Sequence, residues 1–302
     1  MSRVIVVYKK STLEYYKGKS FIENLKKKNS ALYAQFQQMH DDHYKSVELF
    51  LNKIEKTRVP CFIHERGRNQ MPATKKNDLI VTIGGDGTFI YASHYVKDAP
   101  MLGINSAPDY SIGYYCNYNI YQDSFDLNKI LNDYFHNKQP VFKPIHRITY
   151  SINGKESNNY ILNDILITDK NPATTSRYIL QIDENIYSQK SSGIWVSSAS
   201  GSGAAYKSAG GKPFKQYNKE KLRQFAVIAR EVYSHKKENF TKAIVHEKQK
   251  FEIISAMIDG MIYIDGGQKS TPMQIGDKLN IYFSENPLNV ILDKSTKLKS
   301  GV

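Results

Sequence analysis

The stretch from Asp78 to Ser93, DLIVTIGGDGTFIYAS, limits the possible folds of this chain more than any other segment. Its first part, Asp78 to Ile83, is mostly apolar and β-branched, which predicts a buried strand. The turn Gly84 to Gly87 then interrupts the apolar residues, and they resume in a pattern that predicts a helix beginning near Thr88. A strand that runs directly into a glycine turn and a helix is typical of α/β domains with a parallel sheet.

The turn Gly84 to Gly87 is suited to bind phosphate. Backbone without side chains lets a phosphate come close, and the unpaired amides and the dipole of a helix start face it. Asp86 would repel a phosphate unless it binds magnesium or accepts a proton from an attacking hydroxyl, which is the role of a catalytic aspartate in kinases. Asp86 is therefore the candidate general base. A plain tight turn with the aspartate as a helix cap explains the same residues without any ligand.

Strands and helices are predicted to alternate on both sides of this turn. Arg3 to Tyr8, Val59 to His64 and Met101 to Asn105 are short runs that predict strands. Apolar residues at steps of three or four predict a long helix with one apolar stripe, made of Leu32, Phe36, Met39, His43, Val47, Phe50 and Ile54. Ligands of a parallel sheet bind at the carboxyl ends of its strands, and here those ends include Gly84 to Thr88 and Asn105.

The pattern changes after Pro140. Residues 145–168 alternate between apolar and polar around Asn153-Gly154, which is a strong signal for a two-residue hairpin. Further short strands are predicted at Ile179 to Ile182, Gly193 to Ser197, Phe251 to Ala256 and Met261 to Ile264. We therefore expect two domains, an α/β domain at residues 1–140 and a β-rich domain at residues 141–283.

The net charge of +13 raises the question of a nucleic-acid partner. The lysines are scattered along the chain, however, and no RNP, zinc-finger or helix-turn-helix signature accompanies them. We expect no nucleic-acid partner, and a small polyanionic substrate accounts for the same charge. The apolar run at the start is too short for a signal peptide and no later stretch approaches membrane-spanning length, so no membrane partner is expected either.

The spacing of cysteine and histidine indicates a reducing compartment and no metal centre. Cys61 and Cys116 lie far apart and form no CxxC or zinc pattern, which favours two reduced thiols in a cytoplasmic protein. His40 and His43 share a helix face, but no third ligand is nearby. A place on the helix surface or at the edge of the core is therefore the simpler interpretation.

Several segments, taken in order, resemble the NAD kinase family and more narrowly its mitochondrial-type branch. Gly84 to Thr88, GGDGT, resembles the phosphate and catalytic motif that this family shares with diacylglycerol kinases, sphingosine kinases and phosphofructokinases. Asn163-Asp164 is similar to the Asn-Glu pair of the family, with a shorter acid. Further similar segments are Gly103 to Pro108, Ser111 to Gly113, Lys190 to Gly193, Ser198 to Ser202, Ser208 to Gly211, Phe225 to Glu231 and Asp265 to Gly267. The joint pattern covers most of residues 79–290.

The resemblance implies transfer of the γ-phosphoryl group of ATP to the 2′-hydroxyl of the adenosine ribose of NAD, with Mg²⁺ or another divalent cation accompanying ATP. Asp86 would orient or deprotonate that hydroxyl. The phosphates would be bound by Gly84, Gly85, Gly87, Thr88 and Asn105, and NAD by Asn163, Asp164, Ser198, Ser200, Ser202 and Ala205. The resemblance also implies a Rossmann-like or phosphofructokinase-like first domain, a β-sandwich second domain, a segment at 284–302 that returns to the first, and a homodimer or higher homo-oligomer.

Three positions depart from the wider family pattern. Ser192 stands where Asp is usual, although the mitochondrial-type branch also has Ser there, and Gly203 and Ala205 stand where Thr and Tyr are usual. The two small residues leave open a non-catalytic NAD(P)-binding protein. A lipid kinase of the diacylglycerol kinase type shares GGDGT and is a further alternative. Trp195 is most simply explained as core packing in a strand.

Overall fold

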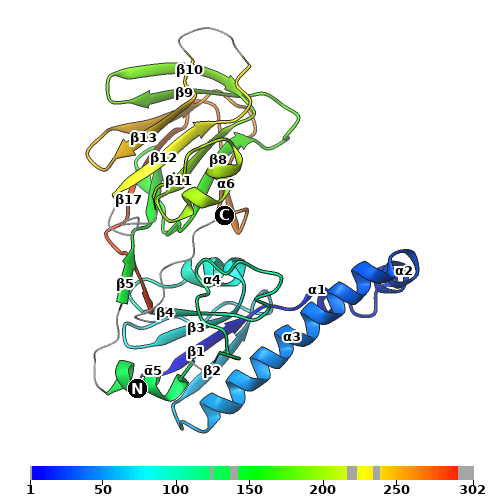
Figure 1. Cartoon of the computed structure of the whole chain (residues 1–302). Helices are drawn as coiled ribbons and strands as arrows, with labels where there is room; N and C mark the ends of the chain where they lie inside the picture. Colours follow the sequence, from blue (N-terminus) through cyan, green and yellow to red (C-terminus); the bar gives the residue numbers. More distant parts are fainter. Residues whose placement is uncertain (1, 123–124, 137–141, 216–222, 234–238, 292–302) are drawn as a thin grey trace. The chain divides into compact units, whose positions relative to one another are not determined.

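The structure, a computed structural model, describes residues 2–122, 125–136, 142–215, 223–233 and 239–291. In these residues the chain forms two compact units (Figure 1). The first contains the chain up to Lys143 and the late strand β18 (Leu288–Ile291), and the second contains Pro144–Pro287. The boundary thus lies a few residues after the expected one. Of the segment 284–302, the part from residue 292 onward lies outside the described residues.

The first unit is built around a parallel sheet. Its described strands are β1 (Val4–Tyr8), β2 (Cys61–Glu65), β3 (Leu79–Gly84), β4 (Met101–Asn105), β5 (Phe142–Ile145) and β18. Its described helices are α1 (Thr12–Tyr15), α2 (Ser20–Lys28), α3 (Ser30–Glu55), α4 (Asp86–Ser93) and α5 (Leu127–Phe135). The strand order is β2-β1-β3-β4-β18-β5, and β1 pairs in parallel with both β2 and β3, as does β4 with β3 and β18.

The order of the strands creates a switch point between β1 and β3. The chain leaves β1 toward β2 on one side and leaves β3 toward β4 on the other. Ligands of open α/β sheets bind at the carboxyl ends of the two strands where this direction changes. The residues that follow those two ends are Lys9 and Gly85.

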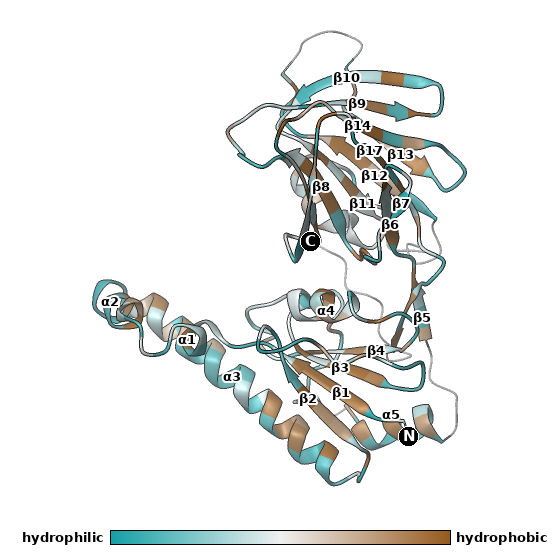
Figure 2. Ribbon diagram, turned by 180° about the vertical axis from the view of Figure 1, so that it is seen from behind, coloured by the Kyte–Doolittle hydropathy of each residue, from teal (hydrophilic) through white to brown (hydrophobic). Residues whose placement is uncertain are grey.

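Helices α3 and α4 cover opposite faces of this sheet (Figure 1). Phe50 and other stripe residues of α3 share one buried cluster with Leu102 and Ile104 of β4. A side chain at Gly103 would point to the opposite face of the sheet, where Phe89 of α4 lies. Figure 2 shows the apolar strands β1 and β3 near the centre of the unit. The layers therefore follow from the alternation of side chains along each strand.

The described residues of the second unit form two six-stranded sheets. One has the order β10-β9-β14-β17-β6-β7 and the other β13-β12-β11-β8-β15-β16. The strands are β6 (Ile148–Ile152), β7 (Lys155–Glu156), β8 (Asp164–Asp169), β9 (Ser176–Ile182), β10 (Asn185–Ser191), β11 (Ile194–Ser198), β12 (Gln224–Ala229), β13 (Lys242–His246), β14 (Phe251–Ser255), β15 (Gly260–Ile264), β16 (Lys269–Met273) and β17 (Lys278–Phe283). The short helices η1 (Gly201–Gly203) and α6 (Ala205–Ser208) follow β11.

The two sheets pack face to face over a shared apolar core. Ile165 and Ile167 of β8 belong to the same buried cluster as Tyr178 and Leu180 of β9 in the other sheet. Alternating residues of β8, β9 and most other strands point into this core, as in a β-sandwich. The predicted parallel α/β domain and β-rich sandwich are therefore confirmed.

Local predictions are confirmed where the sequence pattern is strong. The apolar stripe lies on the long helix α3, and the hairpin turn Asn153-Gly154 has φ angles of 52° and 78°. Helix α4 begins at Asp86, close to the predicted start near Thr88, and Gly85 is its N-cap. None of the helices in the described residues has the length and apolar character needed to cross a bilayer.

Candidate active site

A cavity of about 380 Å³ lies at the switch point of the first sheet, and we call it the switch-point cavity. Its walls come from the glycine turn, the segment after β1, the loop after β4 and one side of α3. The lining residues are Gly85, Asp86 and Gly87; Lys9, Ser11 and Thr12; Asn105, Ser106, Ala107, Tyr110 and Ser111; and Phe36, Met39 and His43.

Asp86 is held at this cavity by both of its carboxylate oxygens. Oδ2 accepts a hydrogen bond from the backbone N–H of Tyr114, and Oδ1 accepts one from the backbone N–H of Tyr115, each at 2.8 Å. A carboxylate oxygen has two lone pairs, so each oxygen keeps one for a further donor. The carboxylate is fixed in position and can still accept a proton from a hydroxyl group in the cavity.

The glycines of the turn permit close packing of the backbone. A Cβ added at Gly84 would lie 2.5 Å from Oγ1 of Thr88. Gly85 and Gly87 line the switch-point cavity, whereas Gly84 and Thr88 are buried and do not. The Thr88 hydroxyl has no hydrogen-bond partner among the described residues. A buried hydroxyl without a partner is unusual, and a ligand oxygen that approaches the turn would supply one.

Asn105 lines the switch-point cavity but uses its side chain to shape the following loop. Its Nδ2 donates to the carbonyl of Ser111 at 2.9 Å, and its Oδ1 accepts from the backbone N–H of Ala107 at 3.2 Å. A Cβ at Gly113 would lie 2.6 Å from the same Nδ2. The predicted contact between Asn105 and a nucleotide stays a prediction.

His43 joins helix α3 to the residues that directly follow β1 and β4. Its Nε2 donates to the carbonyl of Lys9 at 2.7 Å, because a carbonyl oxygen only accepts. Nδ1 then accepts from the hydroxyl of Ser106 at 2.8 Å. Burial lowers the pKa of His43 to about 4, so the ring is neutral at physiological pH. The stripe position predicted for His43 is thus a buried structural contact.

In the second unit, Asn163 and Asp164 lie where β8 begins, and Asp265 holds them. Oδ1 of Asp265 accepts from the backbone N–H groups of Asn163 and Asp164 at 2.7 and 3.0 Å. Oδ2 accepts from the backbone N–H of Leu162 at 3.1 Å. One buried carboxylate therefore fixes the backbone of the whole predicted NAD-binding pair.

The same arrangement changes the acidity of Asp164. Its side chain is buried, and both burial and the nearby charge of Asp265 raise the pKa of Asp164 from 3.8 to about 7. A hydrogen bond from the backbone of Gly266 acts in the opposite direction. Asp164 therefore changes its protonation state close to physiological pH.

This pKa predicts how the stability of the second unit depends on pH. Between about pH 4 and pH 7 the folded state binds more protons than the unfolded state, so the free energy of unfolding falls as the pH rises. Asp164→Asn lacks this carboxyl group. Between pH 5 and pH 8 its free energy of unfolding is therefore expected to fall less than that of the native protein, and the two falls should differ by about 1 kcal/mol or more. Urea denaturation followed by the fluorescence of Trp195, the single tryptophan, measures both proteins. If the free energy of unfolding changes with pH by the same amount in the native protein and in Asp164→Asn, the raised pKa of Asp164 is contradicted.

The hydroxyl groups of the loop after β11 are used within the protein. Ser198 and Ser200 both donate to the carbonyl of Leu162, at 2.5 and 3.0 Å. Ser202 donates to the carbonyl of Ala199 at 2.8 Å and accepts from the backbone N–H of Phe214. Ser198 and Ser200 thus connect the end of β11 and the following loop to the segment that precedes Asn163, and a direct contact of the three serines with NAD stays a prediction.

Ala205 lines a separate cavity of about 470 Å³ in the second unit. Trp195 of β11 and Ser208 of α6 line it as well. Trp195 is half-buried and packs against a small cluster that includes Tyr206. Its indole thus contributes to packing, as expected, and also forms part of the cavity wall beside the small residue at position 205.

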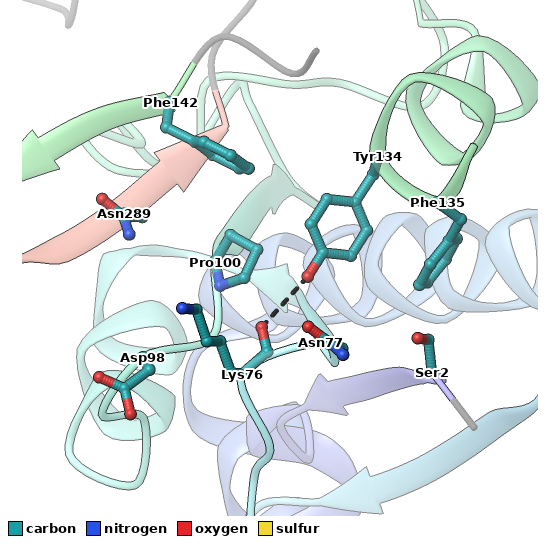
Figure 3. Close-up of a pocket in the computed structure, with 9 residues that line it drawn as sticks. All are labelled: Ser2, Lys76, Asn77, Asp98, Pro100, Tyr134, Phe135, Phe142 and Asn289. Atoms are coloured by element: carbon teal, nitrogen blue, oxygen red, sulfur yellow. Dashed lines mark hydrogen bonds between the residues drawn. The ribbon is translucent and has the colours of Figure 1, made fainter. Parts of the chain in front are cut away.

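A further cavity of about 360 Å³ lies at the opposite ends of the first-unit strands (Figure 3). Lys76, Asn77 and Pro100 come from segments just before β3 and β4, and Tyr134 comes from α5. The Tyr134 hydroxyl donates to the carbonyls of Lys76 and Asp78 at 3.4 and 3.1 Å. Because parallel sheets bind ligands at the carboxyl ends of their strands, this cavity is not the candidate active site.

Sequence reasoning missed three parts of these sites. Tyr114 and Tyr115 hold Asp86 through backbone groups, which no residue type reveals. Asp265 follows a strand and precedes two glycines, and that turn signal was available in the sequence. Lys9 directly follows the first predicted strand. Its position at the carboxyl end of that strand could therefore have been predicted from the sequence.

Comparisons with known proteins agree on one family. The sequence pattern of the ATP-NAD kinase N-terminal domain matches residues 5–135. An NADH kinase from Arabidopsis thaliana is 31% identical over 257 residues, which cover 71% of this chain and 73% of that protein. A probable NADH kinase from Oryza sativa subsp. japonica is 28% identical over 248 residues, which cover 74% of this chain and 73% of that protein.

A solved structure has a similar fold. The crystal structure of an NAD kinase from Archaeoglobus fulgidus in complex with ATP aligns with a TM-score of 0.62 and 20% identity, covering 97% of this chain and 94% of that one. At this identity the likeness bears on the fold alone. The Arabidopsis relative has higher identity over most of both chains, and together with the matched domain pattern it shows that the chain belongs to the NAD kinase family.

Proposed function

We propose that the chain is an NAD kinase, which transfers the γ-phosphoryl group of ATP to the 2′-hydroxyl of the adenosine ribose of NAD and so makes NADP. The observation that carries this proposal is the Asp86 carboxylate, fixed by two backbone amides beside a glycine turn at the switch point of the sheet. Membership of the family supplies the donor and the acceptor, and the geometry supplies a group that can accept the proton.

In the proposed reaction Asp86 accepts the proton of the 2′-hydroxyl. The oxygen of that hydroxyl forms a bond to the γ-phosphorus at the same time. The bond between that phosphorus and the β–γ bridging oxygen breaks, and ADP leaves. The backbone amides of Gly85 and Gly87, at the start of α4, face the phosphates. Thr88 adds a buried hydroxyl that lacks a partner within the described part of the chain.

A divalent cation, Mg²⁺ above all, is proposed to accompany ATP. The described residues contain no group of three or more His, Cys, Asp or Glu side chains that could hold a metal by themselves. Magnesium at nucleotide sites is held mostly by phosphate oxygens and water, with one or two carboxylates. Phosphate oxygens and water can therefore supply most of its ligands at this site. When bound, the cation neutralises charge that develops on the transferred group.

NAD is proposed to be bound by its adenosine at Asn163 and Asp164. Asp164, in either protonation state, has an oxygen that accepts a hydrogen bond from a ribose hydroxyl. Asp265 keeps the backbone of both residues in place. The loop of Ser198, Ser200 and Ser202, together with Ala205, would complete this binding region.

The experiment that tests the proposal is incubation of the purified protein with ATP, Mg²⁺ and either NAD or NADH. We expect ADP and the 2′-phosphorylated dinucleotide in equal amounts. Both acceptors are included because the plant relatives are named NADH kinases. Tight binding of ATP and NAD without turnover would identify a non-catalytic binding protein instead. Phosphorylation of diacylglycerol with no reaction of NAD or NADH would identify a lipid kinase.

We also propose a cytoplasmic location, a homodimer or higher homo-oligomer, and no nucleic-acid or membrane partner. The two widely separated cysteines support a reducing compartment. Light scattering on the purified protein measures the subunit number, and a mass of one chain would contradict the oligomer. Fluorescence imaging of a tagged chain in its native cell tests the location.

A further inference from the structure

A second cavity of about 380 Å³ lies next to the switch-point cavity, at the carboxyl ends of β1 and β2, and we call it the basic cavity. Lys9 and Lys10 line it from the segment after β1, and Arg66 and Arg68 line it from the turn after β2. Lys9 also lines the switch-point cavity. The two cavities are therefore neighbours that share one cation.

The basic cavity carries an excess of positive charge. Among its described lining residues, four cations face one carboxylate, that of Glu65. Glu65 already forms an ion pair with Lys10 at 3.5 Å and accepts a hydrogen bond from Tyr8 at 3.4 Å. Four positive charges and one negative charge leave a net charge of three. An anion is the ligand that such a cavity attracts.

Two of these cations are partly removed from water. Burial, and the charge of Arg66, lower the pKa of Lys9, and burial lowers the pKa of Arg66. Cations that lie close together and are partly desolvated disfavour one another, and a bound anion removes this disadvantage. The arrangement therefore favours a ligand over an empty cavity.

Arg66 connects the basic cavity to the glycine turn. Its Nη1 donates to the carbonyl of Gly87 at 3.2 Å, and its guanidinium lies 5.1 Å from the ring centroid of Tyr91 on α4. The parallel pairing of Tyr8 with Glu65 is what brings Lys9 and Arg66 together from distant parts of the sequence. The cations are thus positioned by the sheet and by α4, not by a free loop.

We propose that the basic cavity binds the phosphate chain of the phosphoryl donor, namely the phosphates that remain on the donor after transfer, with Lys9, Lys10, Arg66 and Arg68 as their ligands. This assignment rests on the proposed function. The proposal follows from the position of Lys9, which lines both cavities, and of Arg66, which bonds to Gly87. When the terminal phosphate of the donor lies at the glycine turn, the remaining phosphates are within reach of these two cations. The net positive charge of the cavity suits the two negatively charged phosphates that remain on the donor.

The test measures equilibrium binding of Mg-ATP and of inorganic tripolyphosphate by calorimetry, so it needs no turnover. Lys9→Gln/Arg68→Gln removes one cation from each strand end and spares the ion pair of Lys10. Lys155→Gln/Arg177→Gln makes the same change of charge on exposed residues of the second unit and is the matched control. We expect the cavity variant to bind both ligands about 100-fold more weakly, roughly tenfold for each cation lost. The control should bind them as the native protein does.

The outcomes separate this inference from the proposed function. If the cavity variant and the control bind both ligands equally well, the inference is wrong even if NADP forms. If tripolyphosphate binding weakens but Mg-ATP binding does not, the cavity holds some other anion and the donor assignment is overturned. If both weaken and tripolyphosphate displaces Mg-ATP, the inference holds, whether or not NADP is formed. In active protein, the KM for ATP should then rise while the KM for NAD is unchanged.

Discussion

Substitution of Asp86 by asparagine is expected to lower the rate of NADP formation by about 1000-fold, while the affinity for ATP changes by about threefold or less. An amide oxygen is a far weaker base than a carboxylate, so the 2′-hydroxyl loses its proton acceptor. The amide can still accept from the backbone N–H of Tyr114 or that of Tyr115 through its oxygen, but not from both. Initial rates and calorimetric ATP binding, measured on the same preparation, check both parts.

The matched control for this substitution is Asp109→Asn. Asp109 is an exposed acid in the same loop that supplies the partners of Asp86, so the change of charge is the same and the loop is the same. Its rate is expected to stay close to that of the native protein. A rate for Asp86→Asn within about tenfold of the native rate would show that Asp86 only holds the loop of Tyr114 and Tyr115 and is not the base.

Substitution of Asp265 by alanine is expected to lower the free energy of unfolding of the second unit by about 3 kcal/mol or more. The change leaves three backbone N–H groups without their acceptor, those of Leu162, Asn163 and Asp164. Asp265 also has a φ of 49°, a conformation that aspartate adopts more readily than alanine. Because the same bonds position Asn163 and Asp164, affinity for NAD should fall together with stability.

Urea denaturation followed by Trp195 fluorescence measures this loss, since the indole lies in the second unit. Asp259→Ala is the control, because Asp259 is an exposed acid in a turn of the same unit. If Asp265→Ala unfolds at the same urea concentration as the control and binds NAD normally, the three hydrogen bonds do not have the role assigned to them. Loss of the charge of Asp265 should in addition lower the pKa of Asp164, which partly offsets the destabilisation.

Features that depend on neighbouring residues were predictable from the sequence. Strand β4 has the predicted bounds, because four apolar or small residues follow a proline and Asn105 then begins a polar loop. The Asn153-Gly154 turn was predictable because few other residue pairs adopt two positive φ angles in succession. Edge strand β10 was not predicted, since its lysine, glutamine and serines give only a weak alternation.

Features that depend on distant residues were not predictable in this way. Asp86, predicted to be the base, lines the switch-point cavity, but its hydrogen-bond partners are backbone groups 28 and 29 positions away. The serines after β11 resemble ligand contacts in sequence, yet their hydroxyls bond to carbonyls such as that of Leu162 more than 30 positions away. Only the folded chain shows which polar groups are already used.

Strand β18 has a consequence for how the protein is made. It pairs with β4 through Val290 and Met101, so the sheet of the first unit includes a strand that the ribosome synthesises only after the whole second unit. During translation, the edge of β4 that later pairs with β18 is therefore unpaired. The second unit can fold before the sheet of the first unit has all its strands. A chain truncated after Pro287 should accordingly contain a folded sandwich and an unfinished, protease-sensitive first unit.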